Sequence, residues 1–113
     1  MDKKPEISII IPAYNEEENI PILMEKLNEM IKRDGSAFEV ILVDDGSSDN
    51  TYNKAIKYQA KYDFLKVIRH KKTKGITDAL LSGFNVAGGQ IFVFFPADLQ
   101  YMPEDIPKLI TKI

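Results

Sequence analysis

The sequence predicts a single α/β domain with a mostly parallel sheet and alternating helices. Four short apolar runs, rich in β-branched and aromatic residues, are separated by longer segments whose apolar residues recur at helical spacing. Alternation of this kind implies parallel strands joined by helical crossovers. The run at 7–11 is short, β-branched and bounded by Pro12, which is typical of a strand buried on both faces of a parallel sheet, and the run at 40–43 is interpreted as a second buried strand.

The strands and helices follow from these patterns in chain order. The four strands are predicted at residues 7–11, 40–43, 64–68 and 91–95. The four helices are predicted at about 20–34, 48–62, 76–87 and 103–113. Asn19 is expected to cap the first helix, and Pro21 lies in its first turn, where proline is tolerated. The loop signal at 34–36 ends this helix.

Apolar periodicity predicts the buried face of each later helix. In the second helix the expected stripe consists of Tyr52, Ile56 and Ala60. In the third helix it consists of Ile76, Ala79, Leu80, Phe84 and Ala87. In the last helix it consists of Ile106, Leu109, Ile110 and Ile113. The pair Gly88-Gly89 is expected to close the third helix, since glycine is common just after a helix ends.

Composition excludes several classes of protein. The 113 residues, of which 44% are hydrophobic and 28% charged, suit one soluble globular domain. The net charge of −2 argues against a nucleic-acid-binding protein, which usually has a basic excess. The absence of cysteine excludes disulfides and thiolate metal sites. No apolar run approaches the roughly 20 residues that span a bilayer, and we expect no secretory signal after Met1. We therefore expect a cytoplasmic protein.

Polar residues gather just after the carboxyl end of each predicted strand. The four clusters occupy residues 12–18, 44–49, 69–75 and 96–100. In a parallel sheet all four lie at one edge, and open α/β sheets bind ligands at that edge. The loops at this edge are therefore the candidate functional site.

Among these polar residues, Asp45 and Asp98 have the strongest claim to a function. Asp44 and Asp45 are adjacent carboxylates at a strand end, so we expect one of them to face a hydrogen-bond donor or a cation. The same segment is also explained by a turn followed by a helix N-cap. Asp98 follows an apolar strand and a proline, and no capping role is evident for it. Glu17 and Glu18 are better explained as helix-start carboxylates.

The basic segment at 69–74 is interpreted as a solvated loop, with His70 a poor candidate for a metal ligand. Gly75 precedes a helix and would let backbone N–H groups approach a phosphate. This is a weak signal, because the chain has neither a G-x-G-x-x-G motif nor a P-loop.

Three motifs together resemble family 2 of the GT-A-fold glycosyltransferases, especially its dolichol-phosphate mannose synthase-like members. They are Ile9-Ile10-Ile11-Pro12-Ala13-Tyr14-Asn15-Glu16-Glu17, Val43-Asp44-Asp45-Gly46-Ser47-Ser48-Asp49-Asn50-Thr51, and Ala97-Asp98-Leu99-Gln100 with Pro103-Glu104-Asp105. Their order and spacing match the family over the whole chain, which covers only the first half of the family's catalytic domain. The resemblance implies that residues 1–113 form a truncated, Rossmann-like nucleotide-binding half of a GT-A fold.

The resemblance also implies inverting transfer of a sugar from a nucleoside diphosphate sugar to an acceptor such as a lipid phosphate or a saccharide. Tyr14 and Asp45 would hold the nucleoside, and Asp98 would hold Mg²⁺ or Mn²⁺ against the diphosphate. A hard cation of this kind stabilises the charge on the leaving diphosphate. The implied nucleotide-site residues are Pro12, Tyr14, Glu16, Asp45, Gly75 and Asp98, and the implied metal ligands are Asp98 and Gln100. The full-length enzyme would associate peripherally with the cytoplasmic face of a membrane.

The chain also departs from the family pattern. Pro96 replaces the first aspartate of the family's D-x-D motif. In the loop around Gly75, Thr73 stands where the family often has an asparagine, and Thr77, followed by Asp78, stands where it has a second glycine. The family's catalytic base and acceptor-binding elements lie beyond Ile113, so we expect the 113 residues alone to be inactive. A catalytically inactive, glycosyltransferase-like nucleotide-binding or interaction domain remains the alternative.

A phospho-receiver-like domain also places acidic residues at strand ends. It would need a phosphorylated aspartate after the third strand, where this chain has Arg69 and His70. The sequence therefore does not favour a receiver.

Overall fold

The computed structural model describes residues 4–111. Its elements are β1 (Ile7–Ala13), α1 (Ile20–Asp34), β2 (Phe38–Asp45), α2 (Thr51–Lys61), β3 (Leu65–His70), α3 (Ile76–Val86), β4 (Ile91–Phe94), the 3₁₀ turn η1 (Pro103–Asp105) and α4 (Ile106–Thr111). The predicted α/β alternation is confirmed. Ile113 and the side chain of Leu109, which the sequence places in the last helix, lie outside the described part of the chain.

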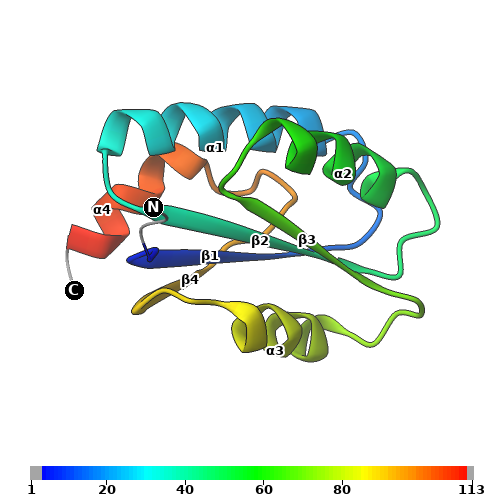
Figure 1. Ribbon diagram of the computed structural model, residues 1–113. Coiled ribbons are helices and arrows are strands. Elements are labelled where there is room, and N and C mark those ends of the chain that lie inside the picture. Colours follow the sequence, from blue (N-terminus) through cyan, green and yellow to red (C-terminus); the bar gives the residue numbers. More distant parts are fainter. Residues whose placement is uncertain (1–3, 112–113) are drawn as a thin grey trace.

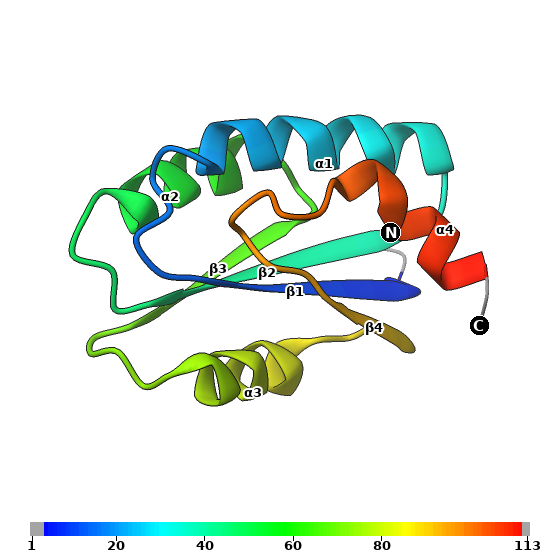
Figure 2. The same cartoon turned by 180° about the vertical axis from the view of Figure 1, so that it is seen from behind.

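The sheet is fully parallel, with the strand order β3-β2-β1-β4. The chain builds the sheet outward from β1 through β2 to β3, and then returns to place β4 on the other side of β1. Helices α1 and α2 cover one face, and α3 alone covers the other (Figure 1). After β4 the chain crosses to the α1 side, where η1 packs against α1 (Figure 2).

The core is densest around β1 and β2. Both strands are buried almost throughout, which confirms the two-sided burial predicted for them. The amphipathic face of α1 supplies the opposing layer, with Ile20, Leu23, Met24 and Leu27 fully buried. Gly35 ends α1 in the left-handed conformation (φ 81°), and its N–H donates to the carbonyl of Ile31. Glycine adopts this conformation without the penalty of a Cβ atom.

Strand β4 is less buried than β1 and β2, and only one of its faces packs against the core. Ile91 and Val93 pack against the main core, whereas Phe92 is 38% and Phe94 56% exposed. Helix α3 packs over β1 and β2 and leaves the same face of β4 largely uncovered. The ring of Phe84 on α3 contacts the ring of Phe92 on β4, with the ring centroids 4.8 Å apart.

Helix α2 does not bury the stripe that its sequence suggested. The buried residues are Thr51 and Ala55, while Ala60 is exposed. The rings of Tyr58 and Tyr62 stack 5.9 Å apart and pack against the core. The core-facing side of α2 therefore includes Ala55 and Tyr58, and is continued by Tyr62 just after the helix.

Helix α3 also differs from its predicted face. It buries only Ala79 and Gly83, while Ile76 and Phe84 are exposed. Small residues face inward because the helix approaches the sheet closely, and a Cβ atom on Gly83 would lie 2.5 Å from Cγ2 of Ile10. The helix ends at Val86, and Gly88 does not cap it: the Gly88 N–H donates instead to the carboxylate of Glu39.

Candidate functional site

A groove of about 370 Å³ lies at the carboxyl ends of β1 and β4. From β1 the chain continues to β2 on one side, whereas β4 lies on the other side of β1. This reversal of the strand order is the topological switch point, where open α/β sheets bind ligands. The groove is lined by Pro12, Ala13, Tyr14, Glu16, Asp45, Thr73, Ile76, Ala79, Pro96, Ala97 and Asp98.

Five of the residues singled out in the sequence line this groove together: Pro12, Tyr14, Glu16, Asp45 and Asp98. Gly75 borders the groove rather than lining it, and its N–H donates to Asp45 Oδ2 at 3.0 Å. Gln100 is exposed and does not contribute to the groove wall within the described residues. Its backbone N–H donates to Asp98 Oδ1 at 3.0 Å within the loop that precedes η1, so this bond orders the loop and does not cap a helix.

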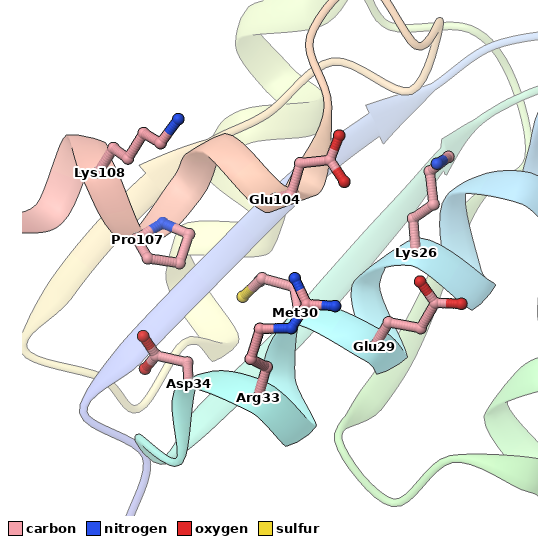
Figure 3. Close-up of a pocket in the computed structure, with 8 residues that line it drawn as sticks. All are labelled: Lys26, Glu29, Met30, Arg33, Asp34, Glu104, Pro107 and Lys108. Carbon is pink, nitrogen blue, oxygen red and sulfur yellow. The ribbon is translucent and has the colours of Figure 1, made fainter.

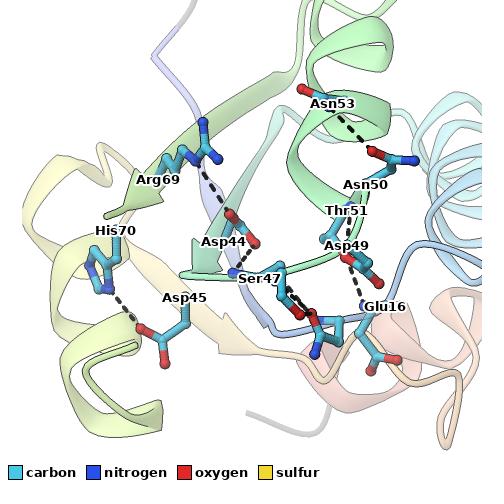
Figure 4. Close-up of polar contacts among 12 residues, drawn as sticks. Glu16, Asp44, Asp45, Ser47, Asp49, Asn50, Thr51, Asn53, Arg69 and His70 are labelled. Carbon is cyan, nitrogen blue, oxygen red and sulfur yellow. Dashed lines mark hydrogen bonds and ion pairs between the residues drawn. The ribbon is translucent and has the colours of Figure 1, made fainter. Parts of the chain in front are cut away.

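Asp45 ends β2 and is only 6% exposed. Its Oδ1 accepts hydrogen bonds from Nδ1 of His70 and from the backbone N–H of Lys74, both at 2.9 Å. Burial alone would raise the pKa of Asp45, but the hydrogen bonds from Lys74, His70 and Gly75 outweigh it and hold this pKa below its ordinary value. Asp45 is therefore a buried carboxylate that stays ionised at neutral pH. Figure 4 shows the His70–Asp45 contact.

His70 is the functional-site residue that sequence reasoning missed. It is the last residue of β3, not part of a solvated loop, and it lies beside Asp45 in the parallel register. Its ring is 6% exposed, and Nε2 lies 2.8 Å from Oγ of Ser82 in α3. Extending the predicted third strand by two residues would have placed His70 at a strand end, but its pairing with Asp45 depends on the register between β2 and β3.

The segment between β3 and α3 is pressed against the end of β2. Gly46 has φ +73°, and a Cβ atom placed on it would lie 2.5 Å from the backbone nitrogen of Thr73. Only glycine permits both this conformation and this approach. The Thr73 wall of the groove is thus positioned by Gly46 as well as by Asp45.

The turn after β1 is tied to the turn after β2 by hydrogen bonds (Figure 4). Asn15, which has φ +52°, donates its N–H to Ser47 Oγ and accepts the Ser48 N–H, each at 2.9 Å. The Glu16 N–H donates to Thr51 Oγ1 at 2.8 Å. These contacts hold the backbone directly after Tyr14, a residue that is 51% exposed at the groove.

Asp44 points away from the groove and has a structural role. It is fully buried, and its Oδ1 accepts the Ser47 N–H at 3.3 Å. Its other oxygen faces Nε of Arg69 at 3.9 Å, and the Arg69 guanidinium lies 4.4 Å from the centroid of the Tyr52 ring. Of the two adjacent aspartates, only Asp45 therefore reaches the groove.

Glu16 is a second carboxylate with a perturbed environment. Burial raises the pKa of Glu16, and the negative charges of Asp98 and Asp49 raise it further, while a hydrogen bond from Asn19 acts in the opposite direction. A cation placed between Glu16 and Asp98 would relieve their repulsion. This makes the Asp98 end of the groove favourable for positive charge.

A second hollow of about 380 Å³ lies between α1 and the η1–α4 segment (Figure 3). Its charged side chains carry both signs, including Lys26, Glu29, Arg33 and Glu104. It is remote from the carboxyl ends of the strands, and none of its ionisable groups belongs to the hydrogen-bond network around Asp45. The groove at the switch point is therefore the better candidate.

Metal and membrane features were assessed over residues 4–111. This part of the chain contains no cluster of three or more His, Asp or Glu side chains that could hold a metal ion by itself. Within the same residues, none of the helices has both the length and the apolar character needed to cross a membrane.

Two curated proteins resemble the chain over nearly its whole length. It is 45% identical to a dolichol-phosphate mannosyltransferase of Pyrococcus furiosus, over 95% of the chain and 30% of that protein. It is 38% identical to an undecaprenyl-phosphate 4-deoxy-4-formamido-L-arabinose transferase of Yersinia enterocolitica, over 97% of the chain and 34% of that protein. The chain thus spans about a third of the length of these relatives.

Solved structures of similar fold include a mannosyltransferase, PcManGT of Pyrobaculum calidifontis, in complex with GDP-Man and Mn²⁺. It has a TM-score of 0.81 and 26% identity over 97% of this chain and 32% of that one. S. aureus TarS in complex with UDP-GlcNAc has a TM-score of 0.75 and 28% identity over 95% of this chain and 30% of that one. The family profile described as Glycosyl transferase family 2 matches residues 8–113. The chain therefore belongs to glycosyl transferase family 2.

Proposed function

We propose that this chain is the donor-binding part of an inverting glycosyltransferase, and that a nucleoside diphosphate sugar occupies the groove at the ends of β1 and β4. The observation that carries the proposal is the convergence of Tyr14, Asp45 and Asp98 on one groove at the switch point. Membership of the family and the nucleotide-sugar complexes of the two similar structures support it.

The groove offers a distinct group for each part of such a donor. The exposed Tyr14 ring provides an aromatic face for the base or ribose, and Asp45 provides a fixed carboxylate for a base N–H. Pro12 and Glu16 complete this wall. Asp98, near the carboxyl end of β4, is the carboxylate on the diphosphate side.

The groove fits a divalent cation that arrives with the nucleotide. Asp98 is an exposed carboxylate, and only its Oδ1 receives the Gln100 N–H. Mg²⁺ and Mn²⁺ prefer oxygen ligands and often take one or two carboxylates, with phosphates and waters completing the shell. Asp98 would hold the ion, which neutralises charge on the leaving diphosphate when bound. Gln100 contributes its backbone to the Asp98 turn, so its side chain remains only a proposed second ligand.

The names of the relatives suggest the acceptor class. Both relatives are named for transfer to a polyprenyl phosphate, either dolichol phosphate or undecaprenyl phosphate. We therefore propose a lipid phosphate as acceptor, with a saccharide as the alternative. A lipid acceptor requires peripheral contact with a membrane, for which the cytoplasmic face is the proposed side.

Calorimetric titration with nucleoside diphosphates, with and without Mn²⁺, tests the donor site. Asp45→Ala should weaken binding by about 1–3 kcal/mol, as expected for a lost buried acceptor. Asp98→Asn should abolish the gain that Mn²⁺ provides, while Mn²⁺ alone should bind weakly to the nucleotide-free protein. Asp63→Asn changes the same charge at an exposed site remote from the groove, and should behave as wild type.

Two results would contradict this assignment. One is the absence of nucleotide binding by the wild type, which would favour the alternative of an inactive interaction domain. The other is a Mn²⁺-dependent gain that survives in Asp98→Asn.

We also expect the 113 residues alone to bind the donor without transferring its sugar. Inverting transfer needs a base that activates the acceptor from the face opposite the diphosphate. Among the described residues, the carboxylates that line the groove are Glu16, Asp45 and Asp98, all assigned to the donor side. An assay with nucleotide sugars and polyprenyl phosphate should therefore detect no product. Turnover that is lost in Asp98→Asn would show that the base lies within these residues.

A further inference from the structure

The loop between β1 and α1 is held by side chains that lie outside the groove. The N–H groups of residues 15–17 all donate to side-chain oxygens at the start of α2 or in the loop before it: to Ser47 Oγ, Thr51 Oγ1 and Asp49 Oδ2, at 2.9, 2.8 and 3.4 Å. The groove residues Tyr14 and Glu16 belong to this loop. Two side chains of the groove are therefore placed by bonds made elsewhere.

Thr51, the first residue of α2, is the centre of these contacts and is fully buried. Its Oγ1 accepts the Glu16 N–H and lies 2.5 Å from Oδ1 of Asp49 (Figure 4). A hydroxyl carries a single hydrogen, which here is directed at Asp49 and leaves a lone pair for the Glu16 N–H. Because the site is buried, removal of the hydroxyl would leave that N–H without a partner, which is costly.

Asp49 fixes the orientation of the Thr51 hydroxyl. Its Oδ1 accepts both the hydroxyl and the N–H of Thr51, and its Oδ2 accepts the Glu17 N–H. Burial would raise the pKa of Asp49, but the bonds from Thr51 and Glu17 outweigh it and hold this pKa below its ordinary value. An ionised acceptor makes a stronger hydrogen bond and polarises the next bond in the series. The series therefore runs from the Glu16 N–H through Thr51 to Asp49.

We infer that Asp49 and Thr51 are positioning residues of the donor site, which hold Tyr14 and Glu16 in place without lining the groove. The contact between Asn15 and Ser47 is exposed, so water can replace it, whereas the Thr51 contact is buried. Asn15 has φ +52°, a left-handed conformation that costs energy and depends on support from its surroundings. The inference rests on the proposed function, because nucleotide binding is what the positioned side chains serve.

Two substitutions at position 51 separate the hydroxyl from the shape of the side chain. Thr51→Val removes the hydroxyl and keeps the branched shape, whereas Thr51→Ser keeps the hydroxyl. Thr51→Val should weaken nucleotide binding at least about fivefold, and Thr51→Ser should stay within about twofold of wild type. Asp49→Asn should also weaken binding, because an amide has one acceptor oxygen where both oxygens of Asp49 accept bonds. Asn53→Ala, at an exposed polar position in the same helical turn, should bind as wild type.

The experiment is calorimetric titration with UDP and with GDP, each with Mn²⁺, well below the unfolding midpoint of every variant. Leu65→Ala separates positioning from general destabilisation, because Leu65 is buried at the amino end of β3, away from the groove. It should lower the free energy of unfolding and leave the nucleotide affinity unchanged. Hydrogen exchange of the Glu16 amide, followed by ¹⁵N NMR, should be slow in the wild type and in Thr51→Ser and fast in Thr51→Val.

This inference and the proposed function fail differently. A wild type that binds neither nucleotide overturns the donor site and the inference with it. If the wild type binds and Thr51→Val binds equally well, the donor site stands and the positioning role is wrong. The role is also wrong if Thr51→Ser binds as weakly as Thr51→Val, or if Leu65→Ala loses as much affinity.

The test does not depend on Thr51→Val being folded. If that variant does not fold, Asp49→Asn and the wild-type exchange rates decide. Binding by Asp49→Asn as tight as that of the wild type contradicts the positioning role. A Glu16 amide that exchanges as fast as that of the exposed Glu18 contradicts it as well.

Discussion

At the scale of single residues, the groove depends on backbone positions as much as on its polar side chains. Gly46 combines a left-handed conformation with backbone contact to Thr73, directly after Asp45. The contact places the N–H groups of Lys74 and Gly75 within reach of the Asp45 carboxylate. Gly46, which has no side chain, thus determines how the Asp45 carboxylate is held.

Gly46→Ala should lower both the free energy of unfolding and the affinity for nucleotide. The added Cβ atom carries the left-handed penalty of roughly 1–2 kcal/mol and also collides with backbone that must move. Gly35→Ala is the matched control, because Gly35 has φ +81° but open space around it. Gly35→Ala should show only the penalty of the left-handed conformation and should leave the nucleotide affinity unchanged. Equal unfolding energies for the two variants in urea would contradict the steric argument.

At the scale of elements, α3 packs on the sheet through its smallest residues. Ala79 and Gly83 face the sheet and bring Ser82 to His70. Because the helix lies close, a methyl group at position 83 would meet Cγ2 of the fully buried Ile10 at 2.5 Å. The same close packing leaves the bulky side of α3, including Phe84, on the surface.

Gly83→Ala should destabilise the protein although alanine is the better helix former. The propensity gain is about 1 kcal/mol, whereas overpacking a rigid core typically costs about 1–3 kcal/mol. We expect a net loss of unfolding free energy together with a disturbed His70–Ser82 contact. Asn85→Ala, at an exposed position of the same helix, should be neutral or slightly stabilising. A stabilised Gly83→Ala variant would show that α3 can move outward freely.

At the scale of the whole molecule, a buried cluster at the end of the sheet opposite the groove joins three strands. Glu39 on β2 is 6% exposed and accepts from the Ser8 hydroxyl of β1 at 2.6 Å, from the Gly88 N–H that precedes β4, and from Lys66 of β3. Burial would raise the pKa of Glu39, but these bonds outweigh it and lower the pKa below its ordinary value of 4.5.

This lowered pKa predicts acid-sensitive stability. Because the folded state favours the ionised form of Glu39, this carboxylate adds to the free energy of unfolding. Its contribution is complete above pH 4.5 and is lost as the pH falls through the lower pKa of the folded state. Glu39→Gln should therefore cost about 1–3 kcal/mol of unfolding free energy at neutral pH. The difference from wild type should shrink in acid. Urea unfolding across pH measures this, with exposed Glu25→Gln as control, expected within about 0.5 kcal/mol of wild type. A difference that does not vary with pH would contradict the ionic contribution.

The sequence by itself determined the α/β alternation, the parallel sheet and the edge where the polar residues meet. These features depend on local patterns: apolar periodicity identifies strands and helices, and carboxylates after buried strands share one edge because parallel strands point the same way. Tyr14, Asp45 and Asp98 were accordingly brought into one groove, as their positions after strands had predicted.

Only the tertiary structure decided how Asp45 is held and which faces are covered. The His70–Asp45 contact depends on the register between β2 and β3, and the Ser82 contact depends on where α3 lies. The exposure of Phe92 and Phe94 depends on α3 covering other strands. Such features arise from contacts between residues distant in the chain, whose pairing no local pattern of apolar and polar residues specifies.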